Sequence, residues 1–159
     1  MVKGTEIYEC EIKDVDDSVK ELWLGLAREM FEIERLILPS EANGDKWVEF
    51  VCEGLASGRN FLLVAKNGSR LVGFAYAGIF PEHFQVSNLV GRIDDVYVLP
   101  EFRGKGIGKK LVVQCLNKMN AVGVKAVRLQ VLTENKVAIR LYEKLGFKTN
   151  RYGMIKQIP

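Results

Sequence analysis

The chain has 159 residues, of which 48% are hydrophobic and 27% charged, and a formal net charge of +3. This composition is typical of a globular protein, and the length predicts a single domain over residues 1–159. The weak positive charge, without a basic stretch interleaved with aromatic residues, argues against nucleic-acid binding. No apolar run reaches the ~20 residues that span a membrane, and the first residues lack the apolar core of a signal peptide. We therefore expect no membrane association and a cytoplasmic location.

Cysteine and histidine content limits the metal chemistry. Cys10, Cys52 and Cys115 are widely spaced and form no Cys-x-x-Cys pair, and His83 is the only histidine. These residues provide too few soft ligands for a zinc site. We expect reduced cysteines and a site without a metal ion.

Hydrophobic periodicity predicts alternating strands and helices along the chain. A period of two predicts strands, and a spacing of three to four residues predicts helices. The pair Asn67-Gly68 between two apolar runs predicts a hairpin. In chain order we expect a strand at 5–12, helices at 15–36 and 45–55, strands at 61–65 and 71–79, a loop at 81–91, a strand at 92–99, a helix ending near 119 or 120, a strand at 126–132, a helix between 135 and 146, and a strand from 147 onward.

A basic, glycine-rich turn follows the strand at 92–99 and opens the next helix. It reads Arg103-Gly104-Lys105-Gly106-Ile107-Gly108-Lys109. The N–H groups of such a turn form a concavity at the positive end of the helix dipole, and glycine lets an anion approach the backbone closely. The turn therefore predicts a site for the pyrophosphate of a cofactor. A plain connection between strand and helix is the alternative.

Two familiar phosphate-binding loops do not fit this turn. The dinucleotide fingerprint Gly-x-Gly-x-x-Gly would need glycine where Lys109 stands. A P-loop would need glycine in place of Arg103 and serine or threonine in place of Lys110. The pattern that is present is Arg-x-x-Gly-x-Gly, formed by Arg103, Gly106 and Gly108.

This pattern resembles the acyl-CoA loop of the GNAT superfamily of N-acetyltransferases. A second segment, Asn135–Phe147, resembles that family's second motif in its Asn, Ala, Leu-Tyr-Glu-Lys and Leu-Gly-Phe elements. The two motifs make the resemblance specific over residues 60–148. It implies an α/β (α+β) fold, the GNAT acyl-CoA N-acyltransferase fold, with a mixed central sheet of about six to seven strands flanked by about four helices.

The resemblance also implies acetyl-CoA (coenzyme A) as co-substrate and transfer of the acetyl group directly to a primary amine. The pantetheine arm would pair with the backbone of the strand before the turn, and the pyrophosphate would lie on the N–H groups of the turn. The cofactor-binding residues implied in this way are Val96, Tyr97, Val98, Arg103, Gly104, Lys105, Gly106, Ile107, Gly108, Lys109 and Asn135.

Two side chains are implied to move protons. Tyr142 matches the family's general acid, which protonates the departing thiolate; a core aromatic residue is the alternative. The amine must be neutral to attack, and the family often places an acid on the strand where this chain has Asp94 and Asp95. Strand alternation predicts opposite faces for these two aspartates. We assign the base to Asp94, with Asp95 or a water chain as alternatives. Either aspartate could instead be a salt-bridged or solvated strand residue without a role in catalysis.

The identity of the acceptor is left open by the sequence. A small-molecule amine is favoured over a protein amine at the level of the family, and residues 30–45 and 81–91 would shape its site. A non-catalytic acyl-CoA-binding or regulatory module of the same fold is the alternative, although the retention of Tyr142 argues against it. A nucleotide-binding module ranks third because the fingerprints fail. Many relatives dimerise, so a homodimer is also left open.

Overall fold

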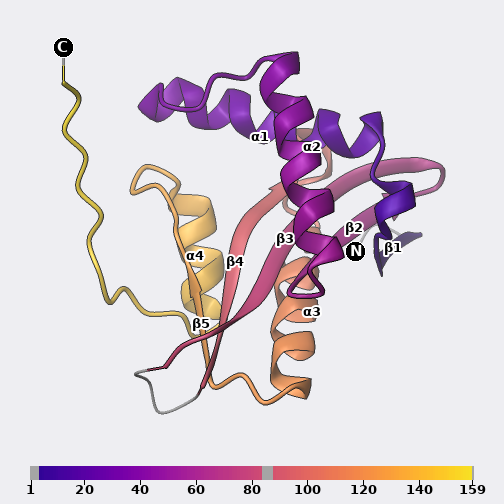
Figure 1. Cartoon of the computed structure of the whole chain (residues 1–159). Coiled ribbons are helices and arrows are strands. Elements are labelled where there is room, and N and C mark those ends of the chain that lie inside the picture. Colours follow the sequence, from indigo (N-terminus) through magenta and orange to yellow (C-terminus); the bar gives the residue numbers. More distant parts are fainter. Residues whose placement is uncertain (1–3, 84–87, 159) are drawn as a thin grey trace.

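The computed structural model describes residues 4–83 and 88–158, and Figure 1 shows a central sheet with helices on both faces. Within this part of the chain no helix combines the length and the hydropathy that a bilayer crossing requires. The strands are β1 (Thr5–Glu9), β2 (Asn60–Asn67), β3 (Arg70–Pro81), β4 (Leu89–Val98) and β5 (Ala126–Leu129). The helices are α1 (Asp17–Glu34), α2 (Glu41–Ala56), α3 (Ile107–Ala121) and α4 (Lys136–Lys144), with short 3-10 turns η1 (Ile12–Asp14) and η2 (Pro100–Phe102).

The strands form one mixed sheet in the order β1-β2-β3-β4-β5. Neighbours are antiparallel from β1 to β4, and β5 pairs with β4 in parallel. This confirms the expected fold class, although the described residues form five strands rather than six to seven. The pairing of β4 with β5 ends at Ile93 and Leu129. The last five residues of β4, 94–98, therefore have no partner from β5.

Two hydrophobic cores hold the helices to the sheet. On one face α1 and α2 cover the sheet, and their core contains Trp23, Trp47, Tyr76 and Tyr97. On the other face α3 packs through its own apolar side, with Tyr142 of α4 at the margin of that core. The last strand before the glycine-rich turn is thus covered by different helices on its two faces.

Helix α2 begins at Glu41, four residues before the predicted start at 45. The Ser40 hydroxyl caps the helix by accepting from the N–H of Asn43 at 3.3 Å. Gly44, which precedes the helix predicted at 45–55, is part of α2 and lies where α1 and α2 cross. A Cβ at Gly44 would lie 3.0 Å from Cγ of Lys20, so glycine here allows the two helices to approach closely.

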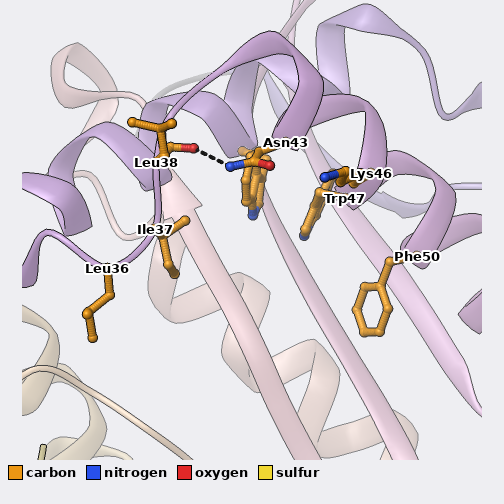
Figure 2. A pocket seen from close by; sticks show the side chains of 8 residues that line it. Leu36, Ile37, Leu38, Asn43, Lys46, Trp47 and Phe50 are labelled. Atoms are coloured by element: carbon orange, nitrogen blue, oxygen red, sulfur yellow. Dashed lines mark hydrogen bonds between the residues drawn. The ribbon is translucent and has the colours of Figure 1, made fainter. Parts of the chain in front are cut away.

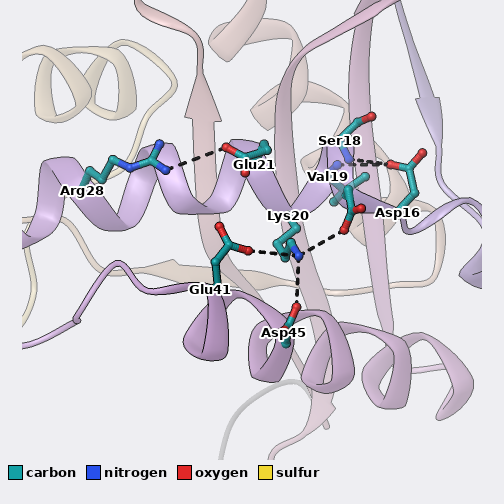
Figure 3. A network of polar contacts seen from close by, with 9 residues as sticks. Asp16, Ser18, Val19, Lys20, Glu21, Arg28, Glu41 and Asp45 are labelled. Carbon is teal, nitrogen blue, oxygen red and sulfur yellow. Dashed lines mark hydrogen bonds and ion pairs between the residues drawn. The ribbon is translucent and has the colours of Figure 1, made fainter.

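An ionic cluster also fastens α1 to α2, as Figure 3 shows. The Lys20 ammonium lies 3.1 Å from Asp17, 3.2 Å from Glu41 and 3.1 Å from Asp45. Hydrogen bonds to these carboxylates raise the pKa of Lys20. The cluster fixes the relation of α2 to α1, and the connection between them is therefore anchored at both ends.

Two expected segments differ from the structure. The loop predicted at 81–91 is shorter, because β3 extends to Pro81 and β4 begins at Leu89; residues 84–87 lie outside the described residues. The strand predicted from Phe147 onward is wrong for residues 147–158, which form no strand. Tyr152 and Met154 in this segment are almost fully exposed, so no apolar face is buried there to compensate for ordering a strand. The hairpin predicted at Asn67-Gly68 is confirmed.

Candidate active site

The glycine-rich turn presents a row of unpaired backbone donors. Gly104 and Gly106 have φ values of 73° and 83°, which glycine adopts without strain. The first bond into α3 runs from the N–H of Lys110 to the Gly106 carbonyl at 3.0 Å. Within the described chain, none of the six N–H groups of residues 104–109 donates to an acceptor. Unpaired donors at a helix N-terminus bind anions, so the turn is suited to a pyrophosphate.

The space around the turn is also suited to an anion. A Cβ at Gly104 or Gly106 would meet no atom within 4 Å, and one at Gly108 would meet only Leu141 and Val98, at 3.7 and 3.8 Å. The packing of the protein would therefore allow a side chain at position 108, and it does not explain why this residue is glycine. Ile107 is buried in the α3 core, and its side chain anchors the turn while the backbone remains accessible.

The Arg103 side chain is exposed but is bonded to neighbouring residues of the protein. Its Nε donates to the Val98 carbonyl at 2.8 Å, and its guanidinium forms an ion pair of 2.6 Å with Glu29 of α1. The guanidinium also lies over the Tyr97 ring, 5.3 Å from the centroid. Arg103 thus joins the end of β4 to α1, and its side chain does not extend into the row of N–H groups. The Lys105 ammonium is also bonded within the protein, because it donates to the Glu101 carbonyl at 2.7 Å.

Beyond Ile93, some backbone N–H and C=O groups of β4 point away from β3, in the direction from which an added strand could pair with them. The Tyr97 carbonyl faces β3, since a Cβ on Gly73 would lie 2.7 Å from it. Backbone direction alternates along a strand, so the groups of Val96 and Val98 point to the side that β5 has left. The Val98 carbonyl accepts from Arg103, whereas β5 offers no partner to the rest. The Tyr97 side chain is buried under Gly25 of α1.

A β-bulge places both aspartates on one face of the sheet. Tyr76 pairs with Asp95 and Ala77 with Ile93, so Asp94 is the extra residue. Ile93 precedes the bulge and packs in the α3 core. From Asp94 onward, the alternation of side chains between the two faces is shifted by one residue relative to Ile93. Burial in the α1–α2 core raises the pKa of Tyr76, and the charges of both aspartates add to this rise. The expectation that Asp94 and Asp95 lie on opposite faces is therefore wrong.

The two aspartates have different partners. Asp94 forms an ion pair of 2.5 Å with Arg92, and its side chain is 25% exposed. Asp95 accepts from Nε1–H of Trp47 at 3.0 Å. Burial raises the pKa of Asp95 to about 6; the charge of Asp94 adds to this rise, and the Trp47 bond opposes it. A carboxyl group whose pKa lies near neutrality can exchange a proton at physiological pH, which favours Asp95 as a functional residue.

A pocket of about 390 Å³ lies beside Trp47, between α2 and the connection from α1 (Figure 2). The Trp23 and Trp47 rings stack with centroids 5.6 Å apart. The Asn43 side-chain amide donates to the Leu38 carbonyl at 2.9 Å and so fixes the connection over the pocket. The pocket is lined by Trp23, residues 36–38, Asn43, Lys46, Trp47 and Phe50.

Tyr142 lies on α4, which Asn135 caps by accepting from the N–H of Ala138 at 3.1 Å. The Tyr142 ring contacts Phe147 edge to face, with centroids 5.8 Å apart. Burial raises the pKa of Tyr142 to about 12, so its hydroxyl remains protonated at neutral pH. This hydroxyl makes no hydrogen bond within the described chain. The predicted cap at Asn135 is confirmed, whereas its contact with the cofactor remains a prediction.

The bond between Trp47 and Asp95 and the place of Phe50 in the pocket were not predicted from the sequence. One signal for the bulge was present. Ile93 and Val96 are both apolar but three positions apart, whereas regular alternation separates residues on one face by two. Nothing in the sequence placed Trp47 beside Asp95, because 48 residues separate them.

The comparison with known protein families agrees with this geometry. Residues 23–147 match the acetyltransferase (GNAT) family, and the chain belongs to this family. Among solved structures, an acetyltransferase of Trypanosoma brucei superposes with a TM-score of 0.73 and 26% identity, over 97% of this chain and 99% of that one. The family's fold thus extends over nearly the whole chain.

Two curated relatives are similar over part of the chain. A mycothiol acetyltransferase of Pseudarthrobacter chlorophenolicus is 34% identical over 101 residues, which are 61% of this chain and 31% of that protein. The spermine/spermidine N(1)-acetyltransferase of Bacillus subtilis is 36% identical over 83 residues, 50% of this chain and 54% of that protein. The matches thus span about a third to a half of the length of these relatives.

Proposed function

We propose that this chain is an acyl-CoA-dependent N-acetyltransferase that transfers an acetyl group from acetyl-CoA to a primary amine. The observation that carries the proposal is the row of six N–H groups at residues 104–109 that have no acceptor among the described residues. They lie at the start of α3, beside the part of β4 that does not pair with β5. Membership of the GNAT family and relatives named as acetyltransferases support it.

The residues present fit acetyl-CoA in two places. The N–H groups between Gly104 and Lys109 would bind the pyrophosphate. The backbone of Val96 and the N–H of Val98 would pair with the pantetheine arm, since the Val98 carbonyl already accepts from Arg103. Lys109, which is exposed, adds positive charge at the turn. The bound co-substrate supplies the activated thioester, and the protein orients its carbonyl toward the acceptor amine.

Tyr142 and Asp95 are the residues we propose to move protons. The Tyr142 hydroxyl, kept protonated by burial, donates to the sulfur that leaves. Asp95 accepts a proton from the amine, and we prefer it to Asp94, which is already paired with Arg92. A lysine-like amine with a pKa of about 10.4 lies ~3.4 units from neutrality at pH 7, so loss of its proton costs about 4.6 kcal/mol.

The proposal is tested first by thermal melting with acetyl-CoA, free CoA, ATP and NAD. A ligand that binds only the folded state stabilises it by about 2.7 kcal/mol at a hundredfold excess over the dissociation constant. We expect a higher melting temperature with both CoA species, and amine-dependent release of thiol from acetyl-CoA. A larger shift with ATP or NAD, or no shift with CoA, would contradict the interpretation of the turn.

The assignment of the base is tested with Asp95→Asn and Asp94→Asn. We expect Asp95→Asn to lower kcat/KM at neutral pH by at least tenfold while acetyl-CoA binding is retained. Asp94→Asn should have the smaller effect, because Asp94 is held by Arg92 on the exposed part of the strand. The reverse order of the two effects would return the assignment to Asp94.

A further inference from the structure

Exposed apolar side chains gather at the pocket beside Trp47. Leu36, Leu38 and Phe50 are large apolar residues that are 50%, 56% and 52% exposed. They come from the connection after α1 and from α2, and Figure 2 shows Phe50 and the Leu36–Leu38 connection around Trp47. Apolar surface left in water around a concave site is typical of a ligand pocket whose ligand is itself apolar.

The charges around the pocket disfavour a polycation. Within the described chain no acidic side chain lines the pocket, and Lys46 is its one charged lining residue. Lys46 forms no ion pair with a described residue. The Asn43 amide is already bonded to the Leu38 carbonyl. A second ammonium group on the acceptor would thus lie among apolar walls or near Lys46, where nothing would neutralise it.

The carboxylate of Asp95 is bonded to one wall of the pocket. Trp47 lines the pocket, and its Nε1–H holds Asp95 at 3.0 Å. Asp95 directly precedes Val96, whose backbone faces the gap beside β4. An amine at Asp95 would therefore be near the proposed thioester, while the group that carries it would extend between Trp47, Phe50 and Leu38.

We infer that this pocket is the acceptor subsite and that it takes a primary amine carried on an apolar or aromatic group, with no second positive charge. The inference rests on the proposed acetyl transfer and specifies its substrate class. The aromatic rings contribute apolar contact and attraction for the one ammonium group, and Asp95 provides a carboxylate for it.

Intrinsic fluorescence gives a readout that does not depend on acetyl transfer. The chain contains two tryptophans, and both, Trp23 and Trp47, line the pocket. Titration of the full chain with 2-phenylethylamine in the presence of free CoA should change the emission saturably. We expect its dissociation constant to be at least tenfold lower than that of spermidine, and ethylamine to bind more weakly than 2-phenylethylamine. Spermidine binding as tightly as 2-phenylethylamine would overturn the inference.

Phe50→Glu tests the apolar wall directly. The substitution adds a negative charge at a half-exposed position, so we expect it to weaken 2-phenylethylamine binding at least tenfold and to improve spermidine binding. Val122→Glu is the matched control, because Val122 is 56% exposed at the end of α3 and does not line the pocket. An unchanged preference in Phe50→Glu would contradict the assignment of the pocket.

The melting temperature with acetyl-CoA, measured beside this titration, separates failure of this inference from failure of the proposed function. If acetyl-CoA fails to raise the melting temperature, the proposed function is wrong regardless of the fluorescence result. If acetyl-CoA binds and the amine preference is reversed, only the substrate class is wrong. Acetyl transfer should follow binding, with a kcat/KM for 2-phenylethylamine at least tenfold above that for spermidine.

Discussion

The indole Nε1–H of Trp47 donates to Oδ2 of Asp95 at 3.0 Å and so connects α2 to β4. The same indole lines the pocket and stacks on Trp23. One side chain therefore forms part of the wall of the proposed acceptor site and also lowers the pKa of the carboxylate next to it, against the larger effect of burial. A change in the pocket that moves Trp47 should accordingly change the pH at which Asp95 ionises.

Trp47→Phe should move the acidic limb of the pH profile to higher pH. The Trp47 bond stabilises the charged form of Asp95 and opposes the effect of burial, so removing the donor raises the pKa of Asp95 further above 6. The acidic limb of kcat/KM, measured from pH 5 to 8, reports this pKa in the free enzyme. Trp23→Phe is the control, since it changes the stacked ring but leaves the Asp95 bond intact. A limb that stays in place in Trp47→Phe would separate Asp95 from the proton transfer.

Asp95→Asn should stabilise the protein at neutral pH relative to the wild type, and less so in acid. The folded-state pKa of about 6 lies above the ordinary value of 3.8, so folding favours the protonated carboxyl group. Below pH 4 both states hold the proton and no penalty arises. As the pH rises through 6 the folded wild type must carry the charge, at a cost of up to about 3 kcal/mol.

Urea unfolding at pH 4.5, 6 and 7.5 measures this difference. The stability gap between Asp95→Asn and the wild type should widen with rising pH. Asp94→Asn serves as the control, because it removes a partly exposed ion pair worth at most about 1 kcal/mol. A gap that is independent of pH would show that Asp95 titrates at its ordinary pKa.

The sequence predicted local features better than it predicted distant contacts. The Asn67-Gly68 hairpin, the Asn135 cap and the glycine-rich turn depend on neighbouring residues, and each was correctly placed. The bulge at Asp94 depends on the register against β3, and a shift of one residue changes the face of every later side chain. Periodicity within a single strand does not reveal that register.

Long-range packing decided the other differences. Gly44 has a low helical propensity as a residue type, but it lies within α2 at the close contact of α2 with Lys20 of α1. The apolar residues after Phe147 indicated a strand, yet strand propensity stabilises a sheet only where cross-strand neighbours and burial are supplied. The pocket combines residues of α1, its connection and α2, and its existence depends on the angle at which these helices meet.

Gly106→Ala should damage the anion site, whereas Gly108→Ala should not damage the fold. Alanine at Gly106 would have to adopt a φ of 83°, at a cost of about 1–2 kcal/mol. We expect a lower melting temperature and acetyl-CoA affinity reduced at least tenfold, measured by calorimetric titration. At Gly108 a Cβ makes only ordinary contacts at 3.7 and 3.8 Å, and alanine in a helix gains roughly 0.5–1 kcal/mol over glycine.

The pair of glycine variants separates backbone conformation from packing. Gly108→Ala should keep or raise the melting temperature and lose less acetyl-CoA affinity than Gly106→Ala. Equal acetyl-CoA affinity in folded Gly106→Ala and in the wild type would exclude the turn as the pyrophosphate site.

Tyr142→Phe should slow turnover without weakening acetyl-CoA binding. The Tyr142 hydroxyl makes no hydrogen bond within the described chain, so its loss leaves no partner unsatisfied and should change the stability little. General acid catalysis contributes about 10²–10⁴-fold, and we expect kcat to fall by at least tenfold while the dissociation constant of acetyl-CoA stays within about twofold.

Tyr76→Phe is the matched control, because the Tyr76 hydroxyl is buried without a partner among the described residues. Its removal should raise the stability by about 1 kcal/mol and leave kcat unchanged. Full activity in Tyr142→Phe would make Tyr142 a packing residue and require another proton donor for the thiolate.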